Sequence, residues 1–228
     1  MKLGYGGIIM KKLILFFLLL CSMLIAEEGF TGNIDNFENG NITEAPNWWT
    51  FGDIEPVVVD TGIYSKDPLF TYLGKYALKI TGKTKEYYIG GMGCYLGGEA
   101  DSYTHLKIYI YSDGVTTGKI NIQLYDDDNN NYTLEQDVNN NYEPISDDRF
   151  EYQIAVNWKG WKVLLIPLTA FKDTNPKVGD NIWNPSASNG SGGLLHYQMI
   201  FLASKKVGET NIVVDNIKIV NLKGGESK

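Results

Sequence analysis

Apolar and polar residues alternate with a period of two through most of the chain after residue 30, most clearly over residues 106–125. Leu106, Ile108 and Ile110 alternate with polar or aromatic residues, and the pattern resumes over 120–125 after a Gly-containing turn at 112–118. Such alternation on both sides of a turn predicts an antiparallel hairpin with one buried and one solvated face. Side chains two apart share a face, so the solvated face would carry Tyr109, Tyr111, Asn121, Gln123 and Tyr125.

Short strand patterns of this kind recur along the chain, separated by Gly-, Asn- and Asp-rich stretches. They fall at residues 57–59, 76–80, 87–89, 106–111, 120–125, 132–138, 150–156, 163–166, 197–202 and 212–220. No segment keeps an apolar period of 3.6 residues long enough to indicate a helix. Many short strands predict an all-β protein, a β-sandwich of the jelly-roll type. No linker divides residues 27–228, so we expect one domain there.

The first 26 residues have the pattern of a secretory signal peptide. Lys11 and Lys12 precede an apolar run that ends near the small residue Ala26, and Glu27 follows. The run is too short for a good membrane span. Met10 is itself a suitable start for such a peptide, which makes it the alternative initiator to Met1. We expect a secreted or periplasmic protein; the alternative is a lipoprotein anchored at Cys21, for which the preceding Leu20 is unfavourably bulky.

Charge and cysteine content restrict the partners of the mature chain. Removal of Lys2, Lys11 and Lys12 with the signal segment, which holds no acid, changes the net charge from −7 to −10. This balance argues against nucleic acid or an anionic membrane as a partner, because like charges repel. Cys94 remains as the one cysteine of residues 27–228, so neither an intrachain disulfide nor a cysteine metal cluster is expected.

The solvated face of the predicted hairpin combines tyrosines with amide side chains. Aromatic rings can stack on the apolar faces of sugar rings, while amides exchange hydrogen bonds with hydroxyl groups. Arg149, Glu151 and Gln153 alternate with apolar residues on a later strand and would extend this surface. The alternative is that tyrosine is simply favourable on exposed strands, where it forms cross-strand pairs.

Two irregular stretches interrupt the strand rhythm. Residues 126–148 hold two Asn-rich runs and predict a hairpin extension with two turns, because Asn tolerates left-handed backbone. The acidic start of this stretch, 126–130, has part of the spacing of a calcium loop but carries Asn131 where glycine is required, so we interpret it as a solvated turn. Residues 172–193 form a long loop with Trp183, which either covers a ligand or lies beneath its own loop.

The order of several short motifs carries a family resemblance. An acidic opening at residues 35–40 precedes Trp48-Trp49; residues 74–80, 158–162 and 166–171 follow, and the chain closes with residues 213–219. This order resembles the galactose-binding-like jelly rolls of the family 11 carbohydrate-binding modules and of the complex I intermediate-associated domains. The resemblance extends over about residues 30–222 and speaks for fold more strongly than for ligand.

The resemblance implies a structural calcium ion where the opening turn and the closing strand meet. Glu38 and Asp215 would supply carboxylate oxygens there, which suit a hard cation. The alternative is that Glu38 caps a turn and Asp215 bonds to neighbouring backbone.

Sequence motifs of catalysis are incomplete. Glu135 and Asp137 lie two apart as in jelly-roll glucanases, but Asn140 follows where a third carboxylate is expected. His105 and His196 have no nucleophile motif nearby, and His196 alternates with Gln198 as a sheet-face residue would. We therefore predict a non-enzymatic protein that binds carbohydrate through the ligand residues Tyr109, Tyr111, Gln123, Tyr125, Arg149, Glu151, Gln153 and Trp183. The alternative is an assembly protein that uses the same sheet for a protein partner.

Overall fold

The computed structural model describes residues 31–64 and 73–222. The expected signal segment, with its Met10 and Cys21 alternatives, lies outside these residues. Within them, no helix is long and apolar enough to cross a membrane. The few helical segments are single 3-10 turns, namely η1 (Thr61–Ile63), η3 (Leu168–Ala170) and η4 (Ala187–Asn189).

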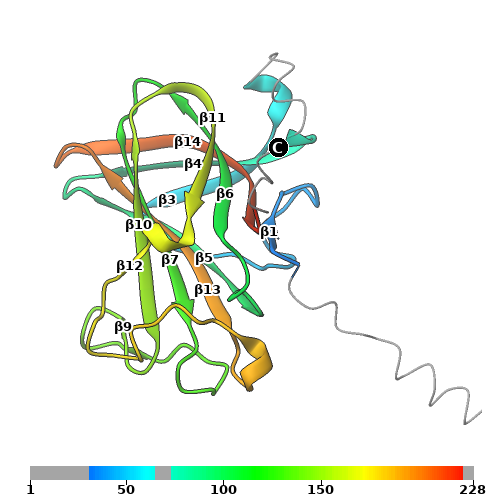
Figure 1. The fold of residues 1–228 in the computed structure, drawn as a ribbon. Helices are drawn as coiled ribbons and strands as arrows, with labels where there is room; N and C mark the ends of the chain where they lie inside the picture. Colours follow the sequence, from blue (N-terminus) through cyan, green and yellow to red (C-terminus); the bar gives the residue numbers. More distant parts are fainter. Residues whose placement is uncertain (1–30, 65–72, 223–228) are drawn as a thin grey trace, which may run out of the picture. The chain divides into compact units, whose positions relative to one another are not determined.

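Two antiparallel six-stranded sheets make up the fold (Figure 1). Sheet A has the order β11-β6-β14-β4-β3, with β1 also paired to β14; its strands are β1 (Asn33–Asp35), β3 (Ile54–Asp60), β4 (Tyr76–Thr84), β6 (His105–Asp113), β11 (Lys159–Pro167) and β14 (Gly208–Val220). Sheet B has the order β12-β10-β7-β13-β5-β2; its strands are β2 (Trp49–Gly52), β5 (Tyr88–Gly98), β7 (Gly118–Asp126), β10 (Asp148–Val156), β12 (Lys172–Asp173) and β13 (Leu194–Ala203). The architecture is a β-sandwich, which confirms the predicted jelly-roll class.

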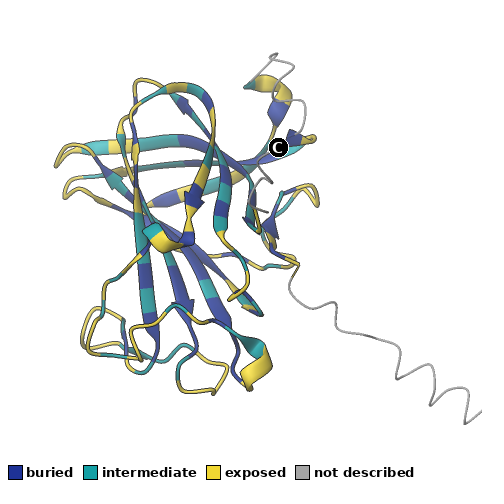
Figure 2. Cartoon of the chain, in the orientation of Figure 1, coloured by how far each residue is buried: buried dark blue, intermediate teal, exposed yellow. Residues whose placement is uncertain are grey.

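The core lies between the two sheets and follows the period-two pattern. The inward side chains of β6 and β7 are at most 1% exposed, and β13 adds buried Tyr197, Met199 and Phe201. Figure 2 shows the buried residues alternating with more exposed ones along these strands. Apolar side chains at every second position therefore hold the sandwich together, as the sequence predicts.

The N-terminal motif residues attach the first strand to this core. The Trp48 indole Nε1 donates a 2.7 Å hydrogen bond to Asp35 Oδ2, and the Phe37 backbone N–H donates one of 2.7 Å to Asp35 Oδ1. Edge-on packing of the Trp48 ring on Tyr197, at 5.9 Å between centroids, joins the motif to sheet B. Asp35 is thus a buried carboxylate with both oxygens bonded, as burial of a polar group requires.

The predicted hairpin of residues 106–125 is wrong, although its alternation is right. β6 pairs with β11 and β14 in sheet A, whereas β7 pairs with β10 and β13 in sheet B. The connection crosses from one sheet to the other. Its loop is held by Asp113, whose Oδ1 accepts the N–H groups of Val115 and Thr116 and whose Oδ2 accepts the Asn211 amide from β14. A Gly-containing turn does not by itself distinguish a hairpin from a crossing between sheets.

The stretch 126–148 is partly as predicted. A small hairpin of β8 (Gln136–Asp137) and β9 (Glu143–Pro144) forms, and its turn carries Asn141 and Tyr142 in the left-handed region. The strand predicted over 132–138 is reduced to β8. The acidic start is not a solvated turn, because Asp126 and Asp127 are only 1% and 4% exposed.

Neighbouring residues of β7 allow the sandwich assignment to be tested. Ile122 is fully buried, and Gln123 lies on the opposite, outer face. Ile122→Ala should lower the free energy of unfolding by about 2–5 kcal/mol because it removes packed methyl groups from the core. Gln123→Ala, the matched control one position away, should cost clearly less in the same urea titration. Equal losses in the two variants would contradict the assignment of their faces.

Candidate functional site

Two rows of side chains cross the outer face of sheet B. Strand register places them side by side, because each member is the pairing partner of the next. The first row runs Trp49, Gly93, Gln198, Gln123, Glu151; the second runs Tyr95, His196, Tyr125, Arg149. Adjacent strands lie about 4.8 Å apart, so a row over five strands spans about 19 Å. We call these nine residues the sheet B rows.

Glycines give the aromatic end of the rows its flat shape. A Cβ atom on Gly93 would lie 2.7 Å from Trp49 Cζ2 and 2.7 Å from Gln198 Cγ, so the Trp49 ring rests against the strand backbone. Phe51 overlies Gly91 in the same way. A ring that lies against a glycine in a sheet leaves its other side free for contact. Trp49 is 36% exposed and Tyr95 46%, which makes them accessible platforms.

His196 joins the aromatic residues into one cluster. Its ring centroid lies 5.0 Å from that of Trp49, 5.8 Å from that of Tyr95 and 6.0 Å from that of Tyr125, all edge-on. Burial lowers the pKa of His196 to about 4, so its imidazole is neutral at pH 7. Nδ1 of this ring is buried without a hydrogen-bond partner among the described residues. His196 therefore acts as a neutral aromatic member of the cluster.

A hydrogen-bond network fixes the polar end of the rows. Tyr125 Oη donates to Gln123 Oε1 at 2.9 Å, and Gln123 Nε2 donates to Glu151 Oε1 at 2.7 Å. Arg149 Nε pairs with the same Glu151 oxygen at 3.1 Å, and Arg149 Nη1 pairs with Glu143 Oε2 at 2.9 Å. Side chains held in this way are preorganised for hydrogen bonds to a ligand. Glu151 makes both bonds through Oε1, which leaves Oε2 available for a hydroxyl group.

The structure brings some of the predicted ligand residues together and separates others. Gln123, Tyr125, Arg149 and Glu151 lie in the sheet B rows, and Gln153 lies beyond them, bonded to Asn121 at 2.9 Å. Tyr125 is only 2% exposed, and burial raises the pKa of its phenol. It supports the network from beneath and offers no free ring face, which corrects the expectation that its ring stacks on a sugar.

Tyr109 and Tyr111 lie on the outer face of sheet A, because β6 belongs to that sheet. Both pack against a cluster of Leu73, Ala77, Trp161 and Val213. The Tyr111 ring lies 5.6 Å from that of Trp161 and 5.2 Å from that of Tyr64. The prediction that these two tyrosines share a face with Gln123 and Tyr125 is therefore wrong.

Trp183 packs on the core side of β10. Its ring meets Phe150 edge-on at 5.3 Å between centroids, and Phe150 pairs with the inward residue Leu124. This side is opposite to the one that carries Arg149 and Glu151. Of the two alternatives, the structure favours the one in which the ring lies beneath its own loop.

Sequence reasoning missed the aromatic half of the rows. Met92 and Cys94 are fully buried, so Gly91, Gly93 and Tyr95 must face outward by alternation. That signal was present in the sequence. The sequence gives no such signal for the position of Trp49, because β2 is a short edge strand and its partner β5 comes about 40 residues later.

The two residues expected to hold calcium make the bonds of the alternative interpretation. Glu38 Oε1 accepts the N–H groups of Lys75 and Tyr76, each at 2.9 Å, and Asp215 Oδ1 accepts the Asn216 N–H at 2.6 Å. Asp215 is nevertheless fully buried, with Oδ2 unpartnered among the described residues. Burial, together with the charges of Glu38 and Asp35, raises the pKa of Asp215 to about 8. An orphaned buried oxygen next to other carboxylates fits a hard cation.

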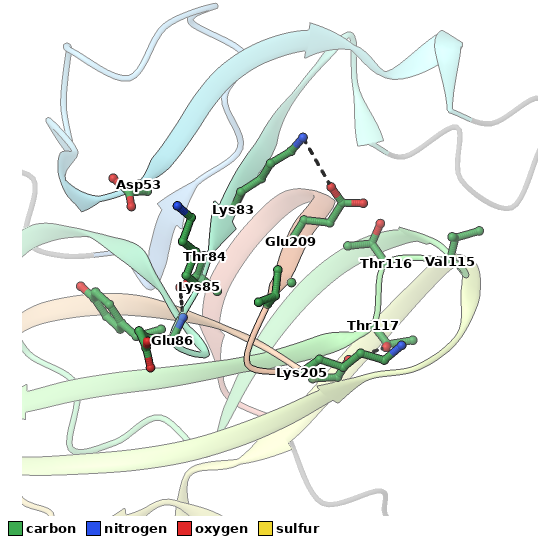
Figure 3. A pocket seen from close by; sticks show the side chains of 14 residues that line it. Asp53, Lys83, Thr84, Lys85, Glu86, Val115, Thr116, Thr117, Lys205 and Glu209 are labelled. Carbon is green, nitrogen blue, oxygen red and sulfur yellow. Dashed lines mark hydrogen bonds and ion pairs between the residues drawn. The ribbon is translucent and has the colours of Figure 1, made fainter.

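A pocket of about 980 Å³ lies near the start of β7, beside the loops that join β4 to β5 and β13 to β14 (Figure 3). Lys83, Lys85, Lys205 and Glu209 line it with several polar residues, and Lys83 Nζ lies 3.9 Å from Glu209 Oε2. Exposed ion pairs of this kind contribute little. With Tyr88 as its one aromatic lining residue, this cavity offers a poorer sugar site than the sheet B rows.

The fold is a β-sandwich jelly roll that solved structures of carbohydrate-binding modules share. The family 11 carbohydrate-binding module of the cellulosomal cellulase Lic26A-Cel5E of Clostridium thermocellum matches with a TM-score of 0.50 and 18% identity, over 85% of this chain and 96% of that one. The solution structure of CtCBM11 matches with a TM-score of 0.51 and 17% identity, over 88% of this chain and all of that one.

Part of an enzyme also shares the fold. An exo-β-agarase matches with a TM-score of 0.53 and 14% identity, over 86% of this chain but 26% of the agarase. No model of a protein family matches the sequence, and no curated protein does. The likeness therefore establishes the fold, and function must be argued from the site.

The depressed pKa of His196 predicts a pH dependence of stability. The native pKa of about 4 lies below the ordinary value of 6.5, so the unfolded chain takes up this proton first as the pH falls. Stability from this group is present above pH 6.5 and is lost between pH 6.5 and 4, by at most about 3 kcal/mol. Compared with His196→Gln in urea titrations, the parent should lose more stability over this range. Parallel curves for the two proteins would contradict the buried, neutral imidazole.

Proposed function

We propose that this protein binds carbohydrate without catalysis on the outer face of sheet B. The observation that carries the proposal is the register of the sheet B rows, which aligns exposed aromatic rings with a fixed polar network in one surface. The carbohydrate-binding modules that share the fold support a ligand of this class. A mature chain secreted after signal cleavage would meet polysaccharides outside the cell.

The rows suggest how a glycan would bind. A polysaccharide chain lies across the strands, with one sugar stacked on the exposed ring of Trp49 or Tyr95. Its next sugars reach Gln123, Glu151 and Arg149. Toward hydroxyl groups the Gln123 amide can donate and accept hydrogen bonds, the Glu151 carboxylate accepts them, and the Arg149 guanidinium donates them. Because the network is already bonded within the protein, little side-chain entropy is lost on binding.

The polar end favours binding over hydrolysis. Glycoside hydrolysis needs two carboxyl groups free to act as acid and as base or nucleophile. Glu151 and Glu143 both pair with the guanidinium of Arg149. These carboxylates are therefore engaged in positioning.

A protein partner on the same sheet is the second candidate. Such an interface is expected to present aliphatic residues in a contiguous patch. Among the outward residues of β7, β10 and β13, the aliphatic ones are Ile200, Leu202 and Ala155, and Lys119 separates Ala155 from Leu202. The others are amides, charged groups and aromatic rings. This composition favours a glycan.

Removal of the exposed ring tests the glycan site. Trp49→Ala should weaken binding of the recognised polysaccharide by a few-fold to about tenfold, because one stacking contact is worth about 0.5–1.5 kcal/mol. Gly93→Ala should weaken it as well, since the new Cβ displaces the Trp49 ring while the ring remains present. A glycan array identifies the ligand, and isothermal titration of folded variants measures the affinities.

Tyr109→Ala, on sheet A, is the matched control for an aromatic residue. It should leave glycan affinity unchanged, whatever it costs in stability. If Tyr109→Ala binds more weakly while Trp49→Ala binds as the parent does, the glycan binds on sheet A and the proposed site is wrong. Failure of the parent to bind any glycan on the array would remove the proposed function.

We further propose a structural calcium ion at Glu38 and Asp215, supported by the orphaned Asp215 Oδ2. A cation that binds only the folded state raises the melting temperature by mass action. The Asp215→Ala variant should therefore gain less from calcium than the parent does in thermal melting, with a chelator as reference. An equal gain in both proteins would remove this site.

A further inference from the structure

A second group of acids lies at the end of sheet B where β7 ends and β10 begins. Carboxylate oxygens of Asp128, Asp148 and Asp180 all lie within 4.8 Å of one another. Asp128 follows β7, Asp148 is the first residue of β10, and Asp180 belongs to the loop that leads to β13. Three segments distant in sequence thus bring one carboxylate each to the same point.

An unpartnered buried oxygen points into this group. Asp148 is 0% exposed, and its Oδ1 has no hydrogen-bond partner among the described residues. A Cβ atom on Gly179 would overlap both this oxygen and Asp128 Oδ2, so the two oxygens converge on the same small space beside a residue without a side chain. Gly179 has a φ of +68°, a conformation that other residues rarely adopt.

Backbone donors orient all three carboxylates. Asp128 Oδ2 accepts the Asp148 N–H at 2.8 Å, Asp148 Oδ2 accepts the Ile182 N–H at 3.2 Å, and Asp180 Oδ1 accepts the same N–H at 2.8 Å. The lysines and arginine that form ion pairs among the described residues pair with other acids. None of these ion pairs includes Asp128, Asp148 or Asp180, so their cations do not neutralise the three carboxylates.

We infer that Asp128, Asp148 and Asp180 form a binding site for a divalent cation with a preference for oxygen ligands, best suited to calcium. Calcium bonds six to eight oxygens at about 2.3–2.6 Å, so one ion can contact oxygens up to about 5 Å apart. Three carboxylates supply part of the shell, and water or backbone carbonyl oxygens complete it. The ion would tie the loop before β13 to the ends of β7 and β10.

Electrostatics without the ion agree with this inference. Burial, and then the charge of Asp148, raise the pKa of Asp128 to about 7. Burial, with Asp173 and Asp180 nearby, raises the pKa of Asp148 to about 6. Carboxylates that repel one another in this way gain most from a bound cation.

Direct calcium titration of the full chain, after treatment with a chelator, tests the site. Asp148→Asn keeps the shape and removes the charge. Asp180→Asn does the same at an exposed position, where the amide oxygen can still accept the Ile182 N–H. Each should lower calcium affinity at this site at least about tenfold, the loss typical of weaker perturbations of metal sites. Asp53→Asn, an exposed acid at the other end of the sandwich, is the control and should bind calcium as the parent does.

A readout without calcium separates ligand from scaffold. In chelator, Asp148→Asn should melt at or above the parental temperature because it relieves repulsion, whereas a purely structural carboxylate would give a lower melting temperature. Asp215→Ala should retain this site, which distinguishes it from the one at Glu38. Parental calcium stoichiometry and affinity in both Asp148→Asn and Asp180→Asn, or no calcium binding by the parent, would overturn the inference. If Asp148→Asn does not fold, Asp180→Asn decides.

Discussion

Burial of every second side chain between the two sheets is the constraint on which the other features of this protein depend. A strand whose inward residues are fixed in the core has no freedom to rotate, so its outward residues are fixed as well. In β7 the burial of Ile122 and Leu124 sets the direction of Gln123. The same rule applied to β5, β10 and β13 aligns the sheet B rows. The candidate binding surface is thus a consequence of core packing.

Alternation could be predicted from the sequence, whereas strand pairing could not. Residues 106–111 and 120–125 are strands with the predicted inward and outward faces. Their partners are set by the topology of the whole chain, through strands β10, β11, β13 and β14 that lie far along the sequence. For this reason the alternation predicts the outward direction of Gln123, Arg149 and Glu151, whereas the prediction that Tyr109 and Tyr111 lie on the same sheet face is wrong.

The acidic run at 126–128 shows a different limit of sequence reasoning. Three aspartates followed by asparagines are typical of a solvated turn, yet Asp126 and Asp127 are buried. Two of their partners are distant in sequence: Asp126 Oδ2 accepts the N–H of Asn184, and Asp127 Oδ2 accepts that of Gly192. Asp127 Oδ2 also accepts the N–H of nearby Tyr132. The loop of residues 172–193, for whose Trp183 the sequence leaves two alternatives, therefore folds over these carboxylates and supplies backbone donors to them.

This loop also connects the acidic group with the binding face. Asp148 and Arg149 are neighbours on β10, so alternation directs one toward the carboxylates and the other toward the sheet B rows. The loop contacts both: the Ile182 N–H donates to Asp148, while Thr174 and Asn175 accept hydrogen bonds from Arg149 at 3.0 and 2.7 Å. Arg149 in turn orients Glu151 and Glu143. A change that loosens the loop from its acidic anchor back to Thr174 and Asn175 would weaken two of the bonds that hold Arg149, and with them the preorganisation of the polar half of the rows.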